Sequence, residues 1–369
     1  MRLALREMRR RPGRFAIAAA LLTLIAMLLM LLGGLLDGLI ARSTGAIRDQ
    51  RADLVVFSAT AEKSFLRSRV PPDLRVRVEA VPGVHRAGGI GVTQLGARVP
   101  GNGPRDLVDV ALIGYQLPPR GLPAAPRRGS AYADSVLRGE GVERGDTLRL
   151  GPARTPVKIL GFVDDTSYSG AGSLWASPTT WRDVQNANRP GSTVGPGVFQ
   201  SLVVQASGDP ATVARRIDEA TGHATQTVSK SEAADSIGGV RQQRSVFNQI
   251  IGVTLGIAIV VVALFFALLT VERVGLYGVL KAIGARSRTL FAGVVIQAVV
   301  VALIAAAIGS AFAVVLDRTL PPGTIPYQLL TSRLVISAVA LVLAAIVGSA
   351  FSLRRVLRVD PASAIGRSS

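Results

Sequence analysis

The sequence predicts a membrane protein with four transmembrane α-helices and a large α+β extracytoplasmic domain inserted between helices 1 and 2. Two observations support this fold class. The chain holds four long apolar runs without charged side chains, and basic residues gather beside those runs. About 20 residues at 1.5 Å per residue cross roughly 30 Å of hydrocarbon, and each run reaches that length. A buried helix of a soluble protein can imitate one such run, but four runs with basic flanks indicate membrane spans.

The positions of the runs divide the chain into successive segments. The first run could also belong to a cleaved signal peptide, but it is longer than a usual signal core and no small-residue cleavage site follows it, which favours a retained span. In chain order the predicted segments are a basic amphipathic helix on the cytoplasmic side (1–15), the first span (16–40), the extracytoplasmic α+β domain (41–245), the second span with a stalk (246–271), a short cytoplasmic helix (272–288), the third span (289–316), a short outer loop (317–331), the fourth span (332–354) and a cytoplasmic tail (355–369).

The distribution of charge predicts the orientation. The net charge is +18, yet residues 1–15, 272–288 and 354–369 hold 14 of the 42 Arg and Lys residues and only three acids. Basic residues close to spans mark the cytoplasmic side. We therefore expect a multi-pass protein of the inner or plasma membrane with both termini in the cytoplasm. The same pattern argues against a nucleic-acid partner, since the charge follows the membrane segments and not a groove for phosphates.

Residues 41–245 show the mixed patterns of an α+β domain, with room for two lobes. The stretches "ADLVVFSA", "LVDVALIGYQL", "GVERGDTLRLG", "TPVKILGFVDD", "GSLWAS" and "ATQTVS" predict strands, and "PPDLRVRVEAVPGV" and "SPTTWRDVQNAN" predict helices. The stretch "FQSLVVQASGDPATVARRIDEATG" predicts a strand, a turn and a helix. From Ser231 to Gln249 the pattern becomes helical, and we expect that helix to continue into the second span. Residues 186–198 are either an ordered turn cluster or a mobile loop. Trp175 and Trp181 are interpreted as packing anchors.

The sequence gives no sign of a catalytic, metal or nucleotide site in this chain. There is no Cys, and His85 and His223 lie far apart, so neither a disulfide framework nor a metal site is expected. The cluster Asp164, Asp165, Ser167 and Tyr168 follows a strand without a visible base or oxyanion donor, which favours a polar loop over a hydrolase site. No P-loop motif is present. We expect a non-enzymatic subunit without a cofactor of its own.

The spans contain no ionisable side chain that could couple transport to an ion; Asp37 sits at the outer margin of the first span. Gln297 fits a helix–helix hydrogen bond. Met27 and Met30 share a helix face, where packing is a simpler role than metal or haem ligation. The small residues Gly33, Gly34, Ala344 and Gly348 allow helices to approach closely. A set of spans without an intramembrane ion site must draw the energy for transport from a source other than an ion gradient.

The segment "ERVGLYGVLKAIGA", Glu272 to Ala285, predicts a short amphipathic helix between the second and third spans, with Gly284 as its C-terminal stop. Its apolar face cannot form a core alone. A plain basic hairpin that only enforces topology is the alternative.

Three stretches resemble the FtsX/MacB-type permeases of ABC transporters. "ERVGLYGVLKAIGARSRTL" resembles the family's E-R-x-x-E-x-x-x-L-K-A-I-G-A stretch, "LALREMRRRPGRFAI" its basic elbow helix, and "RVLRVDPASAIG" its C-terminal tail. The layout of one span, a large outer domain and three spans is also similar. One departure is that many relatives carry a second acid where this chain has Leu276 or Tyr277.

The resemblance implies that residues 272–285 form a coupling helix that docks in a groove of a separate ABC ATPase subunit. It also implies a homodimer of this chain with two ATPase copies, which bind ATP and Mg²⁺, and transmission of their movement to the outer domain (a mechanotransmission, or type VII, machine). The implied coupling residues are Glu272, Arg273, Leu276, Tyr277, Leu280, Lys281, Gly284 and Ala285.

The function expected from this resemblance is a permease that exports or extracts a hydrophobic or amphiphilic compound. Three alternatives stay open. A relative of the cell-division type would activate extracytoplasmic cell-wall hydrolases, an exporter of haem or a small hydrophobic compound would use Met27 and Met30, and a sensor would bind a ligand in the outer domain.

Overall fold

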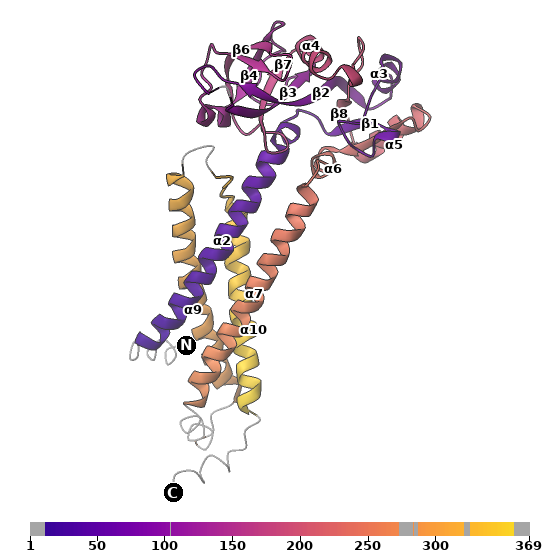
Figure 1. Cartoon of the computed structure of the whole chain (residues 1–369). Helices are drawn as coiled ribbons and strands as arrows, with labels where there is room; N and C mark the ends of the chain where they lie inside the picture. The colour runs from indigo at the N-terminus through magenta and orange to yellow at the C-terminus, as the bar shows by residue number, and fades with distance from the viewer. Residues whose placement is uncertain (1–11, 104, 273–282, 284–286, 321–324, 358–369) are drawn as a thin grey trace. The chain divides into compact units, whose positions relative to one another are not determined.

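The structure is a computed structural model that describes residues 12–103, 105–272, 283, 287–320 and 325–357. The chain forms two compact units (Figure 1). The helix unit comprises residues up to Gly38, Arg244–Leu320 and Tyr327 onward, and the sheet domain comprises Leu39–Gln243 with Pro321–Pro326.

Four long helices make up most of the helix unit. All four are long and apolar enough to cross a membrane, which confirms the predicted spans and makes the chain a multi-pass membrane protein. The first of them begins with a proline. This residue suits the first helical turn, because the N–H groups of that turn have no acceptor within the helix and the N–H that proline lacks is not needed. The helices are α2 (Pro12–Arg48), α7 (Val240–Val271), α9 (Ser287–Thr319) and α10 (Thr331–Leu357).

The helices share one apolar core, to which each contributes buried side chains. Small residues set the closest approaches, as expected for helices packed in lipid. A methyl group at Gly309 of α9 would lie 2.9 Å from Cβ of Ala26 in α2, so the glycine is what lets these two helices touch. Representative members of the core are Phe15, Leu22 and Leu29 of α2, Val262 and Phe266 of α7, Val294, Val301 and Ala305 of α9, and Leu341 and Ala345 of α10.

The sheet domain lies between α2 and α7 in the sequence, as predicted, and all its strands join one nine-stranded sheet with the order β3-β7-β4-β6-β5-β2-β8-β1-β9. The strands are β1 (Leu54–Ser58), β2 (Val84–Arg98), β3 (Leu107–Tyr115), β4 (Ser130–Asp134), β5 (Thr147–Leu150), β6 (Thr155–Val163), β7 (Gly172–Ala176), β8 (Ser201–Ala206) and β9 (Thr225–Ser229).

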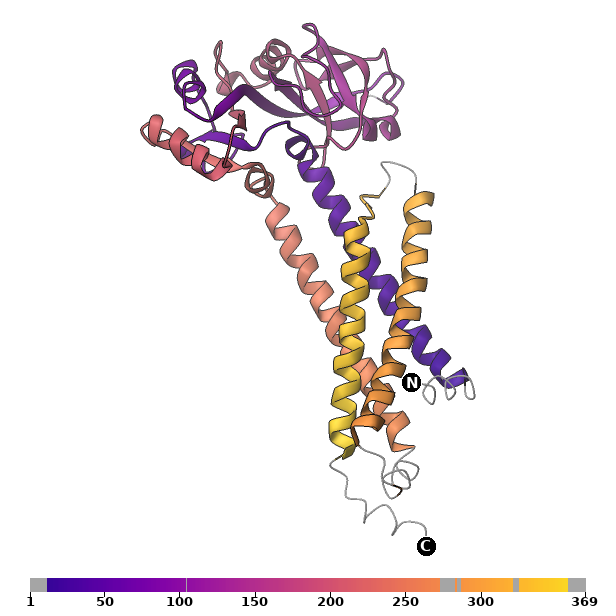
Figure 2. The same ribbon diagram turned by 180° about the vertical axis from the view of Figure 1, so that it is seen from behind.

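Part of the sheet closes into a barrel because β2 also pairs with β3, from Ile90–Tyr115 to Arg98–Leu107. The ring runs β2-β3-β7-β4-β6-β5 and back to β2, so these strands have no free edge. Its interior is filled by small and branched apolar side chains from every strand, including Ala97, Leu112, Ala131, Ile159 and Leu174. The barrel strands gather at one end of the domain in Figure 2, seen from behind.

The remaining strands β8, β1 and β9 extend from the first half of β2 as an open sheet with helices on both faces. On one face pack α3 (Pro72–Glu79) and α5 (Pro210–Ala220). On the other pack the last residues of α2 and the short helix α6 (Lys230–Asp235). α4 (Pro178–Asn188) is capped by Ser177, whose hydroxyl accepts a hydrogen bond from the Thr180 N–H.

Several expectations for this domain need correction. The two strands β2 and β4 were not predicted. The domain has one continuous sheet, and its barrel and its open part have separate apolar cores. The helical pattern from Ser231 does not run unbroken into the second span: α6 ends at Asp235 and α7 starts at Val240, because Gly239 takes a φ of 87°, which a helix cannot accommodate.

Two open questions of the sequence are answered. Residues 186–198 form an ordered turn cluster, in which the Asn186 side chain bonds both the N–H and the carbonyl of Val194, at 2.7 and 3.1 Å. Trp175 and Trp181 are fully buried packing residues, as predicted. Trp181 stacks on Phe199 with ring centres 6.2 Å apart and donates its indole N–H to the Thr93 hydroxyl.

Candidate functional site

The predicted coupling segment begins where α7 ends. Its first residue, Glu272, is exposed, and its N–H donates to the Leu268 carbonyl 3.1 Å away, which prolongs the helical bonding by one residue. The other predicted coupling residues, Arg273, Leu276, Tyr277, Leu280, Lys281, Gly284 and Ala285, lie outside the described residues. Docking to an ATPase therefore stays a prediction.

The end of α2 is joined to the sheet domain by backbone hydrogen bonds. The Ala46 N–H donates to the Ser167 carbonyl at 3.0 Å, the Ser169 N–H donates to the Ser43 carbonyl at 2.8 Å, and the Gly170 N–H donates to the Arg42 carbonyl at 3.2 Å. Bonds in both directions attach the helix to the loop between β6 and β7. This is the Asp164–Tyr168 cluster of the sequence, and its role here is to hold a helix.

The contact is close enough to require a glycine in the helix. A methyl group at Gly45 would overlap the Asp165 carbonyl oxygen and come within 3.1 Å of the Ser167 N. Glycine in a helix interior costs about 0.5–1 kcal/mol relative to alanine. The chain accepts that cost at a position where backbone approaches backbone.

A buried carboxylate, that of Asp134, binds the same loop through a hydrogen bond. Asp134, at the end of β4, is fully buried and accepts a hydrogen bond of 2.6 Å from the Ser167 hydroxyl and one of 3.1 Å from the Val136 N–H. Burial raises the pKa of this carboxyl, and the nearby charges of Asp165 and Asp164 raise it further, while the two hydrogen bonds act in the opposite direction.

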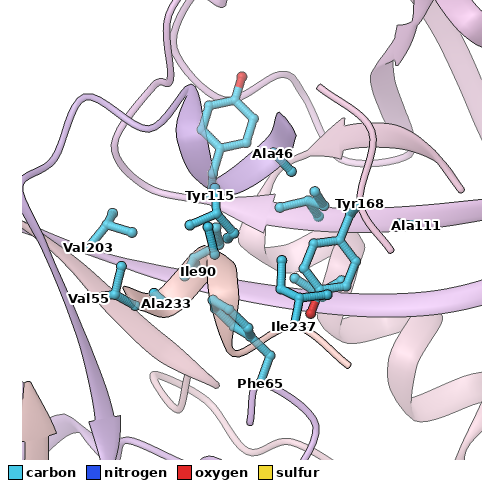
Figure 3. Packing of buried hydrophobic residues seen from close by; sticks show 14 of the residues in the cluster. Ala46, Val55, Phe65, Ile90, Ala111, Tyr115, Tyr168, Val203, Ala233 and Ile237 are labelled. Carbon is cyan, nitrogen blue, oxygen red and sulfur yellow. The ribbon is translucent and has the colours of Figure 1, made fainter. Parts of the chain in front are cut away.

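Apolar packing completes the junction on the same sheet face, which we call the junction face (Figure 3). Ala46 and Ile47 of α2 belong to one buried cluster with Phe65, Tyr168 and side chains of the sheet. The rings of Phe65 and Tyr168 meet edge to face with centres 6.0 Å apart. The sheet contributes Val55, Ile90, Ala111 and Val203.

The segment that leads into α7 packs on the junction face as well. Ala233 and Ala234 of α6, Ile237, and Val240 at the start of α7 are members of the same cluster. Two helices that are far apart in the sequence thus meet one apolar core within the sheet domain. A displacement of either helix end is therefore passed to the same side chains.

A second notable site lies inside the helix unit. The Asp37 carboxylate of α2 accepts two hydrogen bonds from the Arg333 guanidinium of α10, at 2.6 and 2.9 Å. The Asp37 side chain is only 8% exposed and that of Arg333 is 24% exposed, so this is a partly buried bidentate pair. The sequence places Asp37 at the outer margin of the first span and Arg333 directly before the fourth apolar run, and it gives no reason to pair them. The signal in the sequence that could have predicted the pair is the position of two opposite charges at the ends of two apolar runs.

Two further candidates of the sequence, Met30 and Gln297, are buried in the helix unit. The Met30 sulfur is buried and lies 3.7 Å from the Ser310 hydroxyl of α9. Gln297 is buried in the helix core. Within the described ranges, no group of three or more His, Asp or Glu side chains is arranged to hold a metal ion.

Several known proteins are similar to this chain. Residues 248–361 match the family model for the FtsX-like permease C-terminal region. The chain is 29% identical over 374 residues to an uncharacterized ABC transporter permease of Mycobacterium tuberculosis, covering 98% of both chains. It is 20% identical over 369 residues to a protein of Staphylococcus haemolyticus named "Putative hemin transport system permease protein HrtB", covering 99% of both. Among solved structures, the periplasmic region of MacB from Actinobacillus actinomycetemcomitans matches 52% of this chain and 96% of its own length, with a TM-score of 0.36 and 13% identity.

Proposed function

Because the chain is an ABC transporter permease of the FtsX-like family, we propose that it carries the movement of a separate ATPase through its helices to the sheet domain, and so exports or extracts a hydrophobic or amphiphilic compound. One observation supports this most directly: the end of α2 and the start of α7 are both built into the junction face. A domain held in this way responds to its helices as one piece.

The composition of the spans supports this proposal. Their cores are apolar, and the charged pair of Asp37 and Arg333 is internally compensated. A compensated pair has no spare charge for a coupling ion. The energy would then come from ATP and Mg²⁺ bound by the partner, of which we propose two copies.

The coupling residues of the sequence are the proposed contact with that ATPase. Replacing both Leu276 and Leu280 with Asp places charges on the apolar face of the segment, and we expect the ATPase to dissociate on purification. The matched control is Leu66→Asp, since Leu66 is an exposed leucine of the sheet domain, 52% accessible. Full co-purification and unchanged stimulation of ATP hydrolysis by the double variant would exclude this docking site.

The proposed orientation places both termini in the cytoplasm and the sheet domain outside. The natural chain has no Cys, so single cysteines report position without background. We expect an impermeant thiol reagent to label Ser207→Cys in intact cells, because Ser207 is exposed on the sheet domain, and to label Ser368→Cys only after lysis. The reverse pattern would overturn the orientation.

We propose that the chain forms a homodimer through the exposed face of α7. In the described part of the chain, nothing outside the helix's own backbone lies within 4 Å of a Cβ placed at Gly252 or Gly256. The two glycines lie four residues apart, the spacing that allows two membrane helices to approach closely. The exposed apolar residues on this helix are Val246, Ile250, Val253, Ile257, Val260, Leu264, Leu268 and Val271.

A single cysteine tests this dimer. Oxidation of Gly252→Cys should give a covalent dimer, whereas Ile336→Cys on the exposed side of α10 should stay monomeric on a denaturing gel. Equal cross-linking of the two, or none at Gly252→Cys, would argue for another interface.

Haem export is a second candidate, favoured by the name of the staphylococcal relative. The packing of Met30 against Ser310 leaves Met27, half-exposed on the same helix, as the accessible sulfur. Haem binding would give the purified protein a Soret band that disappears in the Met27→Ala/Met30→Ala variant. A band of equal intensity in the variant would assign haem to other residues, and no band on titration with haem would remove this candidate.

A further inference from the structure

The sheet domain has a cavity of about 430 Å³ beside the first residues of β2. Cavities of about 300–1,000 Å³ are of the size that binds small molecules. Three segments of the domain line this one: α3, the start of β2, and the two residues that follow β3. The cavity is therefore built entirely within the sheet domain.

An irregularity in β2 brings two consecutive basic side chains to this cavity. In a regular strand, neighbouring side chains point to opposite faces of the sheet. Here Val84 and Arg86 pair with two adjacent residues of β8, so His85 between them is an extra residue that has no pairing position in that strand. A bulge of this kind redirects side chains, and His85 and Arg86 both line the cavity. Both are exposed, so a ligand can reach them from solution.

The Gln116 side chain is held in one orientation at the wall of the cavity. Its Oε1 accepts the Gly89 N–H at 2.7 Å and an N–H of the Arg75 guanidinium at 2.7 Å. Because two donors meet the oxygen, the amide NH₂ group lies on the other side of the side chain. The Arg75 guanidinium also donates to the Glu79 carboxylate at 2.7 Å, so these two charges of the cavity compensate each other.

The cavity has more unused hydrogen-bond donors than unused acceptors. Among the described residues, no hydrogen bond or ion pair engages the side chains of His85 and Arg86 or the NH₂ group of Gln116. The Arg86 guanidinium carries a full positive charge and several N–H donors in one plane. A carboxylate, sulfate or phosphate group matches this set, because it supplies only acceptors and a negative charge.

Apolar side chains form the rest of the wall. Val84 and Ala87 line the cavity from β2, and Leu117 lines it next to Gln116. A free oxyanion gains nothing from such a surface. An alkyl or ring group attached to the oxyanion would be removed from water there, which is favourable. The combination of donors and apolar wall therefore fits an amphiphilic anion better than an inorganic one.

We propose that this cavity binds the anionic head group of an amphiphilic compound, with Arg86, His85 and Gln116 as hydrogen-bond donors and the apolar wall beside the remainder of the molecule. One part of the inference rests on the proposed function, namely that the compound bound here is the compound that is exported. The exported compound then carries a negative charge.

Binding of octanoate, a carboxylate with a short alkyl chain, tests the site. The full chain is placed in nanodiscs of zwitterionic lipid at neutral pH, and equilibrium dialysis is corrected with empty nanodiscs. We expect saturable binding to the wild type and an affinity lower by about tenfold or more in Arg86→Gln, which loses hydrogen bonds from a charged donor. The matched control is Arg149→Gln, because Arg149 is an exposed strand arginine of β5 that does not line the cavity. Equal affinity of Arg86→Gln and the wild type would overturn the proposal.

A second variant changes the cavity with almost no change in shape. Gln116→Glu keeps an oxygen that can accept from Gly89 and Arg75, but it replaces the NH₂ donor with a negatively charged oxygen. We expect octanoate affinity to fall at least as far as in Arg86→Gln. Unchanged intrinsic tryptophan fluorescence shows that the sheet domain of either variant is folded, because both Trp residues of the chain are buried in it. Retained affinity in a folded Gln116→Glu variant would overturn the proposal.

Two competitors separate the possible ligands. Octyltrimethylammonium has the same alkyl chain with the opposite charge and should not displace octanoate, and inorganic phosphate should displace it only weakly. Displacement by the cation would indicate an apolar site without charge selection, and phosphate as effective as octanoate would indicate a site for free oxyanions. Either result, or the absence of saturable binding, would overturn the proposal. If octanoate binds as expected but the chain stimulates no ATPase, the binding site stands and the proposed function fails.

Discussion

The hydroxyl of Ser167 donates a hydrogen bond of 2.6 Å to the buried carboxylate of Asp134, and the carbonyl of the same Ser167 accepts the N–H of Ala46 in α2. One residue thus connects the barrel strand β4 to the helix that enters the sheet domain. A change at Asp134 should therefore also affect the loop that holds α2.

Asp134→Ala should destabilise the sheet domain by about 1–3 kcal/mol, because the Ser167 hydroxyl and the Val136 N–H lose their buried acceptor. Asp134→Asn keeps an acceptor and should cost less. The only two Trp residues, Trp175 and Trp181, are buried in this domain, so intrinsic fluorescence during unfolding of the full chain reports it. A larger loss in Asp134→Asn than in Asp134→Ala would contradict this role.

The pKa of Asp134 is raised in the folded chain, chiefly by burial, so the folded state binds this proton more tightly than the unfolded state. Its contribution to stability is therefore most favourable below the unfolded pKa and declines as the pH rises through the folded pKa. Asp134→Asn removes the titration. We expect the stability of the wild type relative to Asp134→Asn to fall as the pH rises from the acid range, and a constant difference would refute this.

Gly45→Ala should weaken the attachment of α2, since the methyl group meets the Asp165 carbonyl, and overpacking of this kind costs about 1–3 kcal/mol. Coupled ATP hydrolysis should fall while the ATPase still co-purifies. Gly13→Ala in the same helix is the matched control: none of the described residues lies within 4 Å of the added methyl group, so it should be neutral or slightly stabilising. Similar behaviour of the two variants would show that the close contact is unimportant.

Removing one partner of the Asp37–Arg333 pair should destabilise the helix unit by about 3–5 kcal/mol, because the other charge stays partly buried. The double variant Asp37→Leu/Arg333→Met should recover most of that loss. Thermal unfolding followed by circular dichroism at the helix band measures it. Strictly additive effects of the two single variants would mean that the charges do not interact.

Gly239→Ala should disturb the bend before α7, because alanine is strained at a φ of 87°. The neighbouring Gly238→Ala is the control, since Gly238 shows no positive φ and has open space around it. We expect coupled ATP hydrolysis to fall in the first variant and to persist in the second. If both variants behave like the wild type, the bend is not required for function.

Much of the fold follows from the sequence because its signals are local. The spans are long apolar runs, and α4 and α5 begin with a capping side chain followed by proline. The strand β2 was missed because Gly88, Gly89, Gly91 and Gly96 suggest turns. In the structure these glycines serve packing: the Phe199 ring lies over Gly89 and the Trp181 ring over Gly91, where a Cβ would collide.

The candidate functional sites were harder to predict from the sequence than the fold, because they depend on contacts between segments that are distant in the chain. Asp37 was noticed at the margin of the first span, but only the fold shows that Arg333 of α10 is its partner. Asp134 lies in the short strand β4, whose Ala131 and Ala133 face the barrel interior and give a weak strand signal. Nothing local indicates that the loop from Asp164 to Tyr168 receives a helix.

The long strand β2 belongs to both parts of the sheet domain, the open sheet and the barrel. One half of the strand pairs with β8 in the layer that meets α2 and α6, and the other half forms a stave of the barrel. An extended strand hardly stretches, because its reach is set by bond lengths and angles. The strand β2 therefore joins the layer that contacts α2 and α6 directly to the barrel, and under the proposed transmission of movement a molecule bound to the barrel would be displaced together with that layer.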